Sequence, residues 1–215
     1  YYVWLTKQFT SPINVAIPSG NFGNAYSAWF GRSNGLPISE IFCSTNVNDV
    51  LRRFIDGGVL EPLVTQPSVA PSMDIQIPSS LERLIFDLSD GVKEFYVQLQ
   101  SNSKAQLDKK SFDALKSIFS SFTFPDDIIT TLITSLHTEF DIIFDPHSVT
   151  SVQMALDNDS SIPTVAVATA SPEKFGNVIS PLINGFTESK IDQKEQYLTL
   201  NTENTVIIEA IKAFI

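Results

Sequence analysis

Cysteine and histidine are scarce in this sequence, which has one cysteine and two histidines among 215 residues. The single cysteine, Cys43, excludes an internal disulfide, and its apolar surroundings predict a buried thiol of little reactivity. His137 and His147 stand far from Cys43 and offer no ligand spacing of the kind that zinc sites use. Because histidine is so rare, and because no G-x-S-x-G pattern surrounds Ser19, we expect neither a metal site nor a hydrolase triad.

Positive charge and long apolar runs are also lacking. Lys and Arg number 14 against 24 Asp and Glu, which gives a net charge of −10 and argues against nucleic acid or an anionic membrane as the main partner. No apolar run approaches the roughly 18 to 20 residues of a membrane span, so we expect a cytoplasmic protein. The chain begins at Tyr1 inside an aromatic-rich run, which indicates a fragment, and any targeting segment would precede it.

The stretch 13–24 is typical of a phosphate-binding turn. Residues 13–17 are apolar except for Asn14 and predict a buried strand, Gly20 and Gly23 follow, and residues 25–30 have the apolar spacing of a helix. Glycine permits backbone conformations closed to other residues and lets a ligand approach the peptide N–H groups. The start of a helix adds free N–H groups and a positive dipole end, which favour an anion. An ordinary tight turn between strand and helix is the alternative reading.

Strands alternate with helices at both ends of the chain, which predicts an α/β fold with a mostly parallel sheet, covering helices and a helical segment in the middle. With 43% hydrophobic residues the chain has ample material for a core. We expect residues 1–78 and 146–215 to form the α/β part and residues 79–145 a mainly helical segment.

The expected elements follow from apolar spacing and from Gly and Pro punctuation. They are a helix in 1–12 that Pro12 closes; parallel strands 13–17 and 38–45; a helix that Asn46 caps and Gly57-Gly58 ends; an ordered loop over 59–78; a helix begun by a capping box of Ser79 with Glu82; a helix bearing Phe112, Leu115, Ile118, Phe119 and Phe122; helices after Pro125 and Pro146; a strand 164–169 covered on both faces; and a closing helix capped by Thr202 or Asn204.

Polar residues follow two of the predicted strands. They are the segments 19–24 and 169–174. Ligands of open α/β sheets bind beyond the carboxyl ends of the strands. If both strands run parallel in one sheet, the two segments share one edge, and a ligand with a phosphate at one end and a polar ring atom at the other can bridge them.

Several motifs occur in a fixed order along the chain, and together they resemble threonine synthase of the longer bacterial and fungal type, in its C-terminal half. They are Pro18–Asn24, Gly35–Ile38, Thr45–Val50, Pro71–Gln76 with Leu81–Leu84, Asp145–Ser148 and Ala168–Phe175. The resemblance implies a pyridoxal-phosphate enzyme of fold type II, a lyase that converts O-phospho-L-homoserine and water to L-threonine and phosphate.

The resemblance also implies roles for single residues. The backbone of the glycine turn would hold the cofactor phosphate, and Thr169 would meet the pyridine nitrogen, where a neutral hydroxyl tunes the electron sink. For four further residues the resemblance implies either contact with the substrate or contact with the residues that bind it. The residues of the turn are Gly20, Asn21, Phe22, Gly23 and Asn24, and the further set is Ser19, His147, Ser171 and Lys174.

This chain departs from the family in two respects. The family's Schiff-base lysine lies in the N-terminal half, so we expect no catalytic residue in this chain and expect that missing half as a partner. Ser171 stands where the family usually has histidine. Two alternatives therefore stay open, a catalytically inactive homologue that binds or supports another molecule, and a related phospholyase that releases phosphate without making threonine.

Overall fold

Strand β1 (Ile13–Pro18) lies inside a four-stranded sheet, and all six of its residues are buried. The computed structural model describes residues 1–187, and in it β1 pairs with β2 (Ile38–Thr45) on one side and β6 (Thr164–Ala166) on the other. β5 (Phe119–Thr123) completes the order β5-β2-β1-β6, and every pair is parallel. This confirms the α/β class, the two first strands and their parallel direction.

Helices cover both faces of the sheet, and the side chains of β1 alternate between them as strand geometry requires. Ile13, Val15 and Ile17 pack with α2 (Gly23–Ser33) and α3 (Val50–Gly57) in one core cluster. Ala16 belongs to a second cluster with the helices of the other face, which are α7 (Asp126–Phe140), α8 (Ser148–Leu156) and α9 (Gly176–Ile179). Both faces of β1 are therefore covered, and Asn14 is its one polar residue, which explains why its sequence does not alternate.

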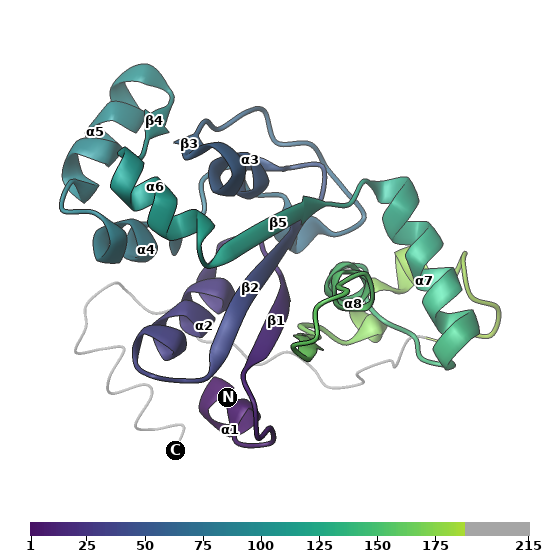
Figure 1. Ribbon diagram of the computed structural model, residues 1–215. Coiled ribbons are helices and arrows are strands. Elements are labelled where there is room, and N and C mark those ends of the chain that lie inside the picture. The colour runs from purple at the N-terminus through teal and green to yellow at the C-terminus, as the bar shows by residue number, and fades with distance from the viewer. Residues whose placement is uncertain (188–215) are drawn as a thin grey trace, which may run out of the picture.

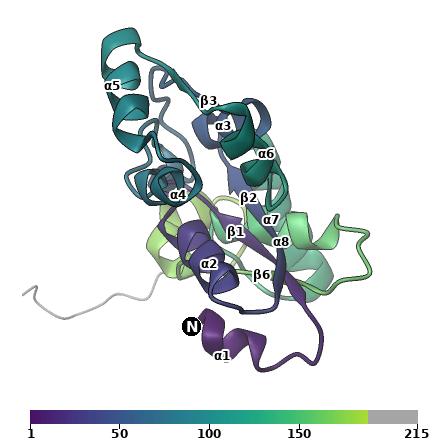
Figure 2. The same ribbon diagram turned by 60° about the vertical axis from the view of Figure 1, so that its left-hand side comes forward.

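Three further helices form a lobe beside α2 and α3, and two short antiparallel strands accompany them (Figures 1 and 2). These elements are α4 (Leu81–Leu88), α5 (Val92–Asn102), α6 (Lys109–Lys116), β3 (Val59–Leu60) and β4 (Ala105–Gln106). The sequence pattern predicted α4 and α6, but it predicted neither α5 nor β4, and it placed β3 in a loop. The remaining elements are α1 (Tyr2–Thr6) and the 3-10 turns η1 (Pro71–Met73) and η2 (Pro172–Phe175).

The chain reverses its direction across the sheet once. From β1 it moves through α2 to β2 and through α3 to β5, always away from β1 in the same direction. It then returns through α7 and α8 on the opposite face to β6, which lies on the free side of β1. The strand order therefore switches between β1 and β6, and this is where open α/β sheets bind ligands.

The predicted helical stripe through Phe119 and Phe122 is wrong, because both residues lie on β5. Their spacing of three fits one face of a helix, but on a strand it places the two rings on opposite faces of the sheet. Phe119 is fully buried, whereas Phe122 is 51% exposed. The stripe therefore ends with α6, and the next residues supply an outer strand of the sheet.

Two predicted caps are also wrong. Asn46 does not cap α3, which begins after Asp49, because its side chain bonds the Ala70 carbonyl and the Asp74 carboxylate across the loop. Ser79 makes no capping box, since its N–H and hydroxyl both donate to Asn21 Oδ1 and α4 starts after Ser80. In both cases a contact distant in sequence takes the side chain that local pattern assigns to a cap.

The ends of some predicted elements shift. The first helix ends at Thr6, ahead of Pro12, and the strand predicted over 164–169 is reduced to Thr164–Ala166. All three residues of β6 are only half-buried, because within residues 1–187 the strand pairs along one edge alone. Val165 packs against the core cluster of one face of the sheet, and α8 contacts the strand.

Two predicted helix ends are confirmed, and two further predictions are not tested by the described residues. Gly58 ends α3 with a left-handed backbone, and Pro125 opens α7, as predicted. The predicted closing helix lies outside the described residues. The division into residues 1–78, 79–145 and 146–215 stays a proposal, although β5 of the middle segment lies in the main sheet.

Replacing Phe119 with alanine should lower the free energy of unfolding by about 3 to 5 kcal/mol, because a fully buried ring leaves a cavity. Phe122→Ala is the matched control and should cost less than about 1 kcal/mol, since half of that ring is already in water. Urea denaturation measures both values. Equal losses would contradict the assignment of this segment to a strand.

Candidate functional site

The two segments singled out in the sequence lie at the same edge of the sheet, one on each side of the switch point. Val167 N–H donates to the Ala16 carbonyl at 2.9 Å, which continues the pairing of β1 with β6 beyond Ala166. Counted on in the same register, Ser19 and Thr169 are corresponding positions beyond the carboxyl ends of β1 and β6. Residues 19–24 and 167–169 therefore frame one position on the rim of the sheet.

The glycine turn presents a row of unused backbone donors. The N–H groups of residues 20–25 have no acceptor among residues 1–187, whereas the flanking N–H groups of Ser19 and Tyr26 donate to Ser44 and Phe22 carbonyls at 2.8 and 2.9 Å. Three of these six groups belong to the first turn of α2, whose dipole is positive at that end. An anion at the turn would satisfy several donors at once.

The unusual backbone of the turn belongs to Phe22 rather than to the glycines. Phe22 has φ of 69°, in the left-handed region that a bulky residue rarely enters, whereas Gly20 and Gly23 have negative φ values. The expectation that the glycines supply special conformations is therefore wrong. The Phe22 ring is buried against Phe119, with centroids 5.4 Å apart, and this contact holds the strained backbone in place.

Gly20 is required for a different reason, which is close packing. A Cβ atom at Gly20 would lie 2.5 Å from the Ser72 carbonyl oxygen and 3.1 Å from Met73 Cα. The turn therefore touches the backbone of η1 directly. At Gly23 the nearest atom to such a Cβ is Ser80 Oγ at 3.4 Å, an ordinary contact.

Both asparagines of the turn are held by residues that the sequence did not single out. Asn21 Oδ1 accepts from Ser79, and the Asn21 carbonyl accepts the Ser80 N–H at 3.1 Å. Asn24 Oδ1 accepts from the hydroxyl of Tyr2 at 2.9 Å and from that of Tyr1. Burial raises the pKa of Tyr2 above its ordinary value, so this phenol remains a donor.

Ser19 is buried beneath the turn and bonds within its own strand. Its hydroxyl donates to the Ile17 carbonyl at 3.3 Å. Neighbouring Cys43 is completely buried, and burial raises the pKa of its thiol to about 12, although a hydrogen bond with Ser19 acts in the opposite direction. This confirms the predicted burial of Cys43, and the raised pKa disfavours the thiolate form that reacts.

His147 lies in a buried cluster behind the rim. Its Nδ1 is 2.8 Å from Asp145 Oδ1, and its Nε2 accepts the Ser72 N–H at 3.1 Å. Burial alone would raise the pKa of Asp145, but hydrogen bonds from His147 and Ser148 outweigh it and hold that pKa below its ordinary value. The carboxylate therefore stays charged at neutral pH, where it also caps the first turn of α8.

Thr169 is anchored through its backbone and leaves its side chain exposed. Its N–H donates to Ser148 Oγ at 3.0 Å, and its own hydroxyl has no hydrogen-bond partner among residues 1–187. Ser171 and Lys174 are also exposed, and their side chains form no hydrogen bond within that range. The ring of Phe175 packs on His147 with centroids 4.8 Å apart, which ties this corner to the buried cluster.

A polar hub fixes the loop that carries Ser72. Asp74 Oδ1 accepts from Asn46, Asn48 and Ser68 at 2.6, 3.0 and 2.6 Å. These bonds explain why residues 61–78 form an ordered loop with little regular structure. Their only signal in the sequence is the density of Asn, Ser and Asp at turn positions.

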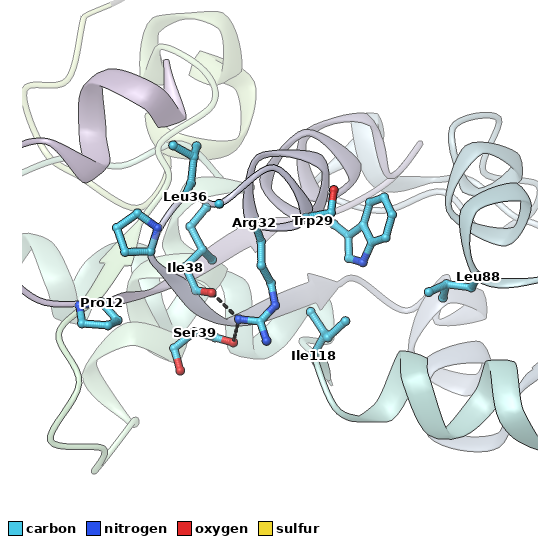
Figure 3. A pocket seen from close by; sticks show the side chains of 11 residues that line it. Pro12, Trp29, Arg32, Leu36, Ile38, Ser39, Leu88 and Ile118 are labelled. Atoms are coloured by element: carbon cyan, nitrogen blue, oxygen red, sulfur yellow. Dashed lines mark hydrogen bonds between the residues drawn. The ribbon is translucent and has the colours of Figure 1, made fainter.

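A cavity of about 550 Å³ lies at the opposite end of the sheet, where the strands begin (Figure 3). Arg32 crosses it and donates to the Ser39 carbonyl at 2.8 Å and to that of Ile38, between apolar walls such as Trp29 and Ile118. None of the candidate residues lies there. The polar groups that could bind a ligand lie at the rim formed by the carboxyl ends of the strands. We therefore place the candidate site at that rim and not in this cavity, despite its size.

The structure of residues 1–187 also bears on membrane spans and metal sites. No helix in that range is long and apolar enough to span a membrane. No group of three or more His, Cys, Asp and Glu side chains in the same range is arranged to hold a metal ion.

Comparison with known proteins identifies relatives. Threonine synthase of Pseudomonas aeruginosa is 30% identical, in a match that covers 83% of this chain and 40% of that protein. Threonine synthase of Saccharomyces cerevisiae is 29% identical over 90% of this chain and 43% of that protein. The crystal structure of pyridoxal-phosphate-bound threonine synthase from Brucella melitensis superposes with a TM-score of 0.84 at 27% identity, over 99% of this chain and 49% of that one. No family model matches the chain.

The chain thus has the fold of the fold type II class, whose enzymes depend on pyridoxal phosphate. Within that class it is a homologue of the threonine synthases. It spans about 40% of the length of the curated relatives, which agrees with the C-terminal half that the motifs indicate.

Substitution of Gly20 by alanine should lower the free energy of unfolding by about 2 kcal/mol, because the new methyl group displaces the backbone at Ser72. Gly23→Ala is the control and should change stability by less than about 1 kcal/mol, since its Cβ has room. Chemical denaturation gives both values. A Gly20 variant as stable as the control would show that η1 does not pack closely on the turn.

Proposed function

We propose that this chain is the C-terminal half of a threonine synthase that uses pyridoxal 5'-phosphate to convert O-phospho-L-homoserine and water to L-threonine and phosphate. Gly20, Asn21, Phe22, Gly23 and Asn24 would hold the cofactor phosphate through their backbone. Thr169 would meet the nitrogen of the pyridine ring. The observation that carries the proposal is the position of both groups on one rim, at the switch point between β1 and β6.

The residues at the rim fit both ends of this cofactor. Six N–H groups in the turn and at the start of α2 have no acceptor among residues 1–187 and match a phosphate. The exposed hydroxyl of Thr169, which has no hydrogen-bond partner in the same range, matches an uncharged ring nitrogen. When bound, the cofactor supplies an electron sink for negative charge on the amino-acid substrate. The protein's part in this chain is to bind the phosphate, orient the ring and keep its nitrogen paired with a neutral group.

The remaining roles fall outside this chain or on its exposed corner. We propose that the N-terminal half of the enzyme, which this chain does not span, supplies the lysine that binds the cofactor covalently. That half is therefore the proposed partner of this chain. Lys174 and Ser171 are candidates for contact with the substrate phosphate or carboxylate, because both are exposed beside Thr169. The proposal places the protein in threonine biosynthesis in the cytoplasm.

A second candidate is a catalytically inactive homologue that serves as a binding or structural protein. Ser171 favours it, because the family usually has histidine at that position. A third, a related phospholyase, differs only in its products. Both keep the phosphate site at the glycine turn, so the three readings separate by product analysis rather than by cofactor binding.

The direct test is turnover by the protein that joins this chain to the missing N-terminal segment. Supplied with pyridoxal phosphate and O-phospho-L-homoserine, it should release phosphate and threonine in equal amounts, because one water molecule replaces one phosphate in each turnover. A phosphate assay and amino-acid analysis measure the two products. Phosphate without threonine would indicate the phospholyase, and neither product despite bound cofactor would indicate the inactive homologue.

A further inference from the structure

A buried carboxylate lies behind the proposed cofactor site and is connected to both of its ends. Asp145 is completely buried, yet it remains charged because hydrogen bonds hold its pKa low. One oxygen bonds the His147 ring and the other bonds the Ser148 hydroxyl. The two connections run to different parts of the rim.

The first connection reaches the glycine turn. Ser72 N–H can only donate, so His147 Nε2 must be unprotonated, and Nδ1 must carry the hydrogen that it donates to Asp145. The same Ser72 touches Gly20, since a Cβ there would lie 2.5 Å from the Ser72 carbonyl. The imidazole therefore acts on the turn through one backbone segment.

The second connection reaches the ring-nitrogen corner. Ser148 Oγ donates to Asp145 and accepts the Thr169 N–H at 3.0 Å. It fixes the backbone from which the Thr169 side chain projects. A single carboxylate thus sets the positions of both proposed contacts, which lie more than 140 residues apart in the sequence.

We propose that His147 is a positioning residue that holds segment 71–73 against Gly20, and so keeps the amide groups of the turn in the geometry that a phosphate needs. This inference rests on the proposed function. The His147 side chain is almost fully buried, and both of its nitrogens are bonded within the protein, so no ring atom is free for a substrate. Its effect on the ligand must pass through Ser72.

Two substitutions of His147 separate its two hydrogen bonds. In His147→Asn the amide nitrogen replaces Nδ1 and keeps the bond to Asp145, but nothing accepts the Ser72 N–H. In His147→Gln the longer side chain places its oxygen near the position of Nε2 and restores that acceptor. Both variants lose the ring contact with Phe175, and each keeps only one of the two hydrogen bonds. His147→Asn therefore tests loss of the Ser72 bond, and His147→Gln tests loss of the Asp145 bond.

The readout is binding of pyridoxine 5'-phosphate and of pyridoxine, measured by equilibrium dialysis. Neither ligand has an aldehyde, so neither requires the covalent lysine. His147→Asn should weaken binding of the phosphate form by about tenfold, because a buried N–H loses its partner and the turn shifts, and should leave pyridoxine unchanged. His147→Gln should stay within about threefold of the unsubstituted protein.

Ser148→Ala is the matched control on the other connection. It should weaken both ligands equally, because it loosens the corner that meets the ring, and should leave the preference for the phosphate form intact. A preference unchanged in His147→Asn would overturn the positioning role while the proposed function stands. An unsubstituted protein with no preference for the phosphate form would overturn the phosphate site itself.

Hydrogen exchange in the unsubstituted protein tests the same bond without a variant, should His147→Asn fail to fold. The Ser72 amide should exchange more slowly than the Asn21 amide, which is also in an exposed loop but has no acceptor among residues 1–187. Equal, fast exchange at both amides would overturn the proposal.

Discussion

The parallel pairing of β1 with β6 is the constraint on which the rest of this structure depends. It brings the carboxyl ends of two strands from opposite ends of the sequence to one rim. The reversal of strand order at this point leaves the rim open between helices of the two faces. The proposed cofactor site exists only while the pairing holds, because neither the turn nor Thr169 can bind both ends of a ligand alone.

The sheet brings the glycine turn and Thr169 to one rim, and hydrogen bonds of buried groups then fix their positions. Asp145 connects to the glycine turn through His147 and Ser72, and to Thr169 through Ser148. Such a buried charge is costly unless every lone pair is used, and here it caps a helix and bonds two side chains. The buried polar groups therefore serve to position the glycine turn and Thr169 at the surface.

Local pattern predicted the sheet because the buried strands are short apolar runs bounded by Gly and Pro, and parallel order followed from the helix between them. It failed at Phe119, whose spacing from Phe122 suits a helix as well as a strand, and only pairing with β2 decides between them. Asn46 and Ser79 read as caps because their partners, Asp74 and Asn21, lie far away in sequence. The roles of Ser72, Tyr2 and the Asp74 hub were not predicted for the same reason, since their partners are also distant in sequence.

The measurement that tests the central claim most directly is an NMR titration of the backbone amides with pyridoxine 5'-phosphate. The phosphate should shift the amides of residues 20–25, and the ring should shift Thr169 and its neighbours, in one saturable event. Shifts confined to the cavity around Arg32, or none at the glycine turn, would contradict a cofactor site at the switch point between β1 and β6.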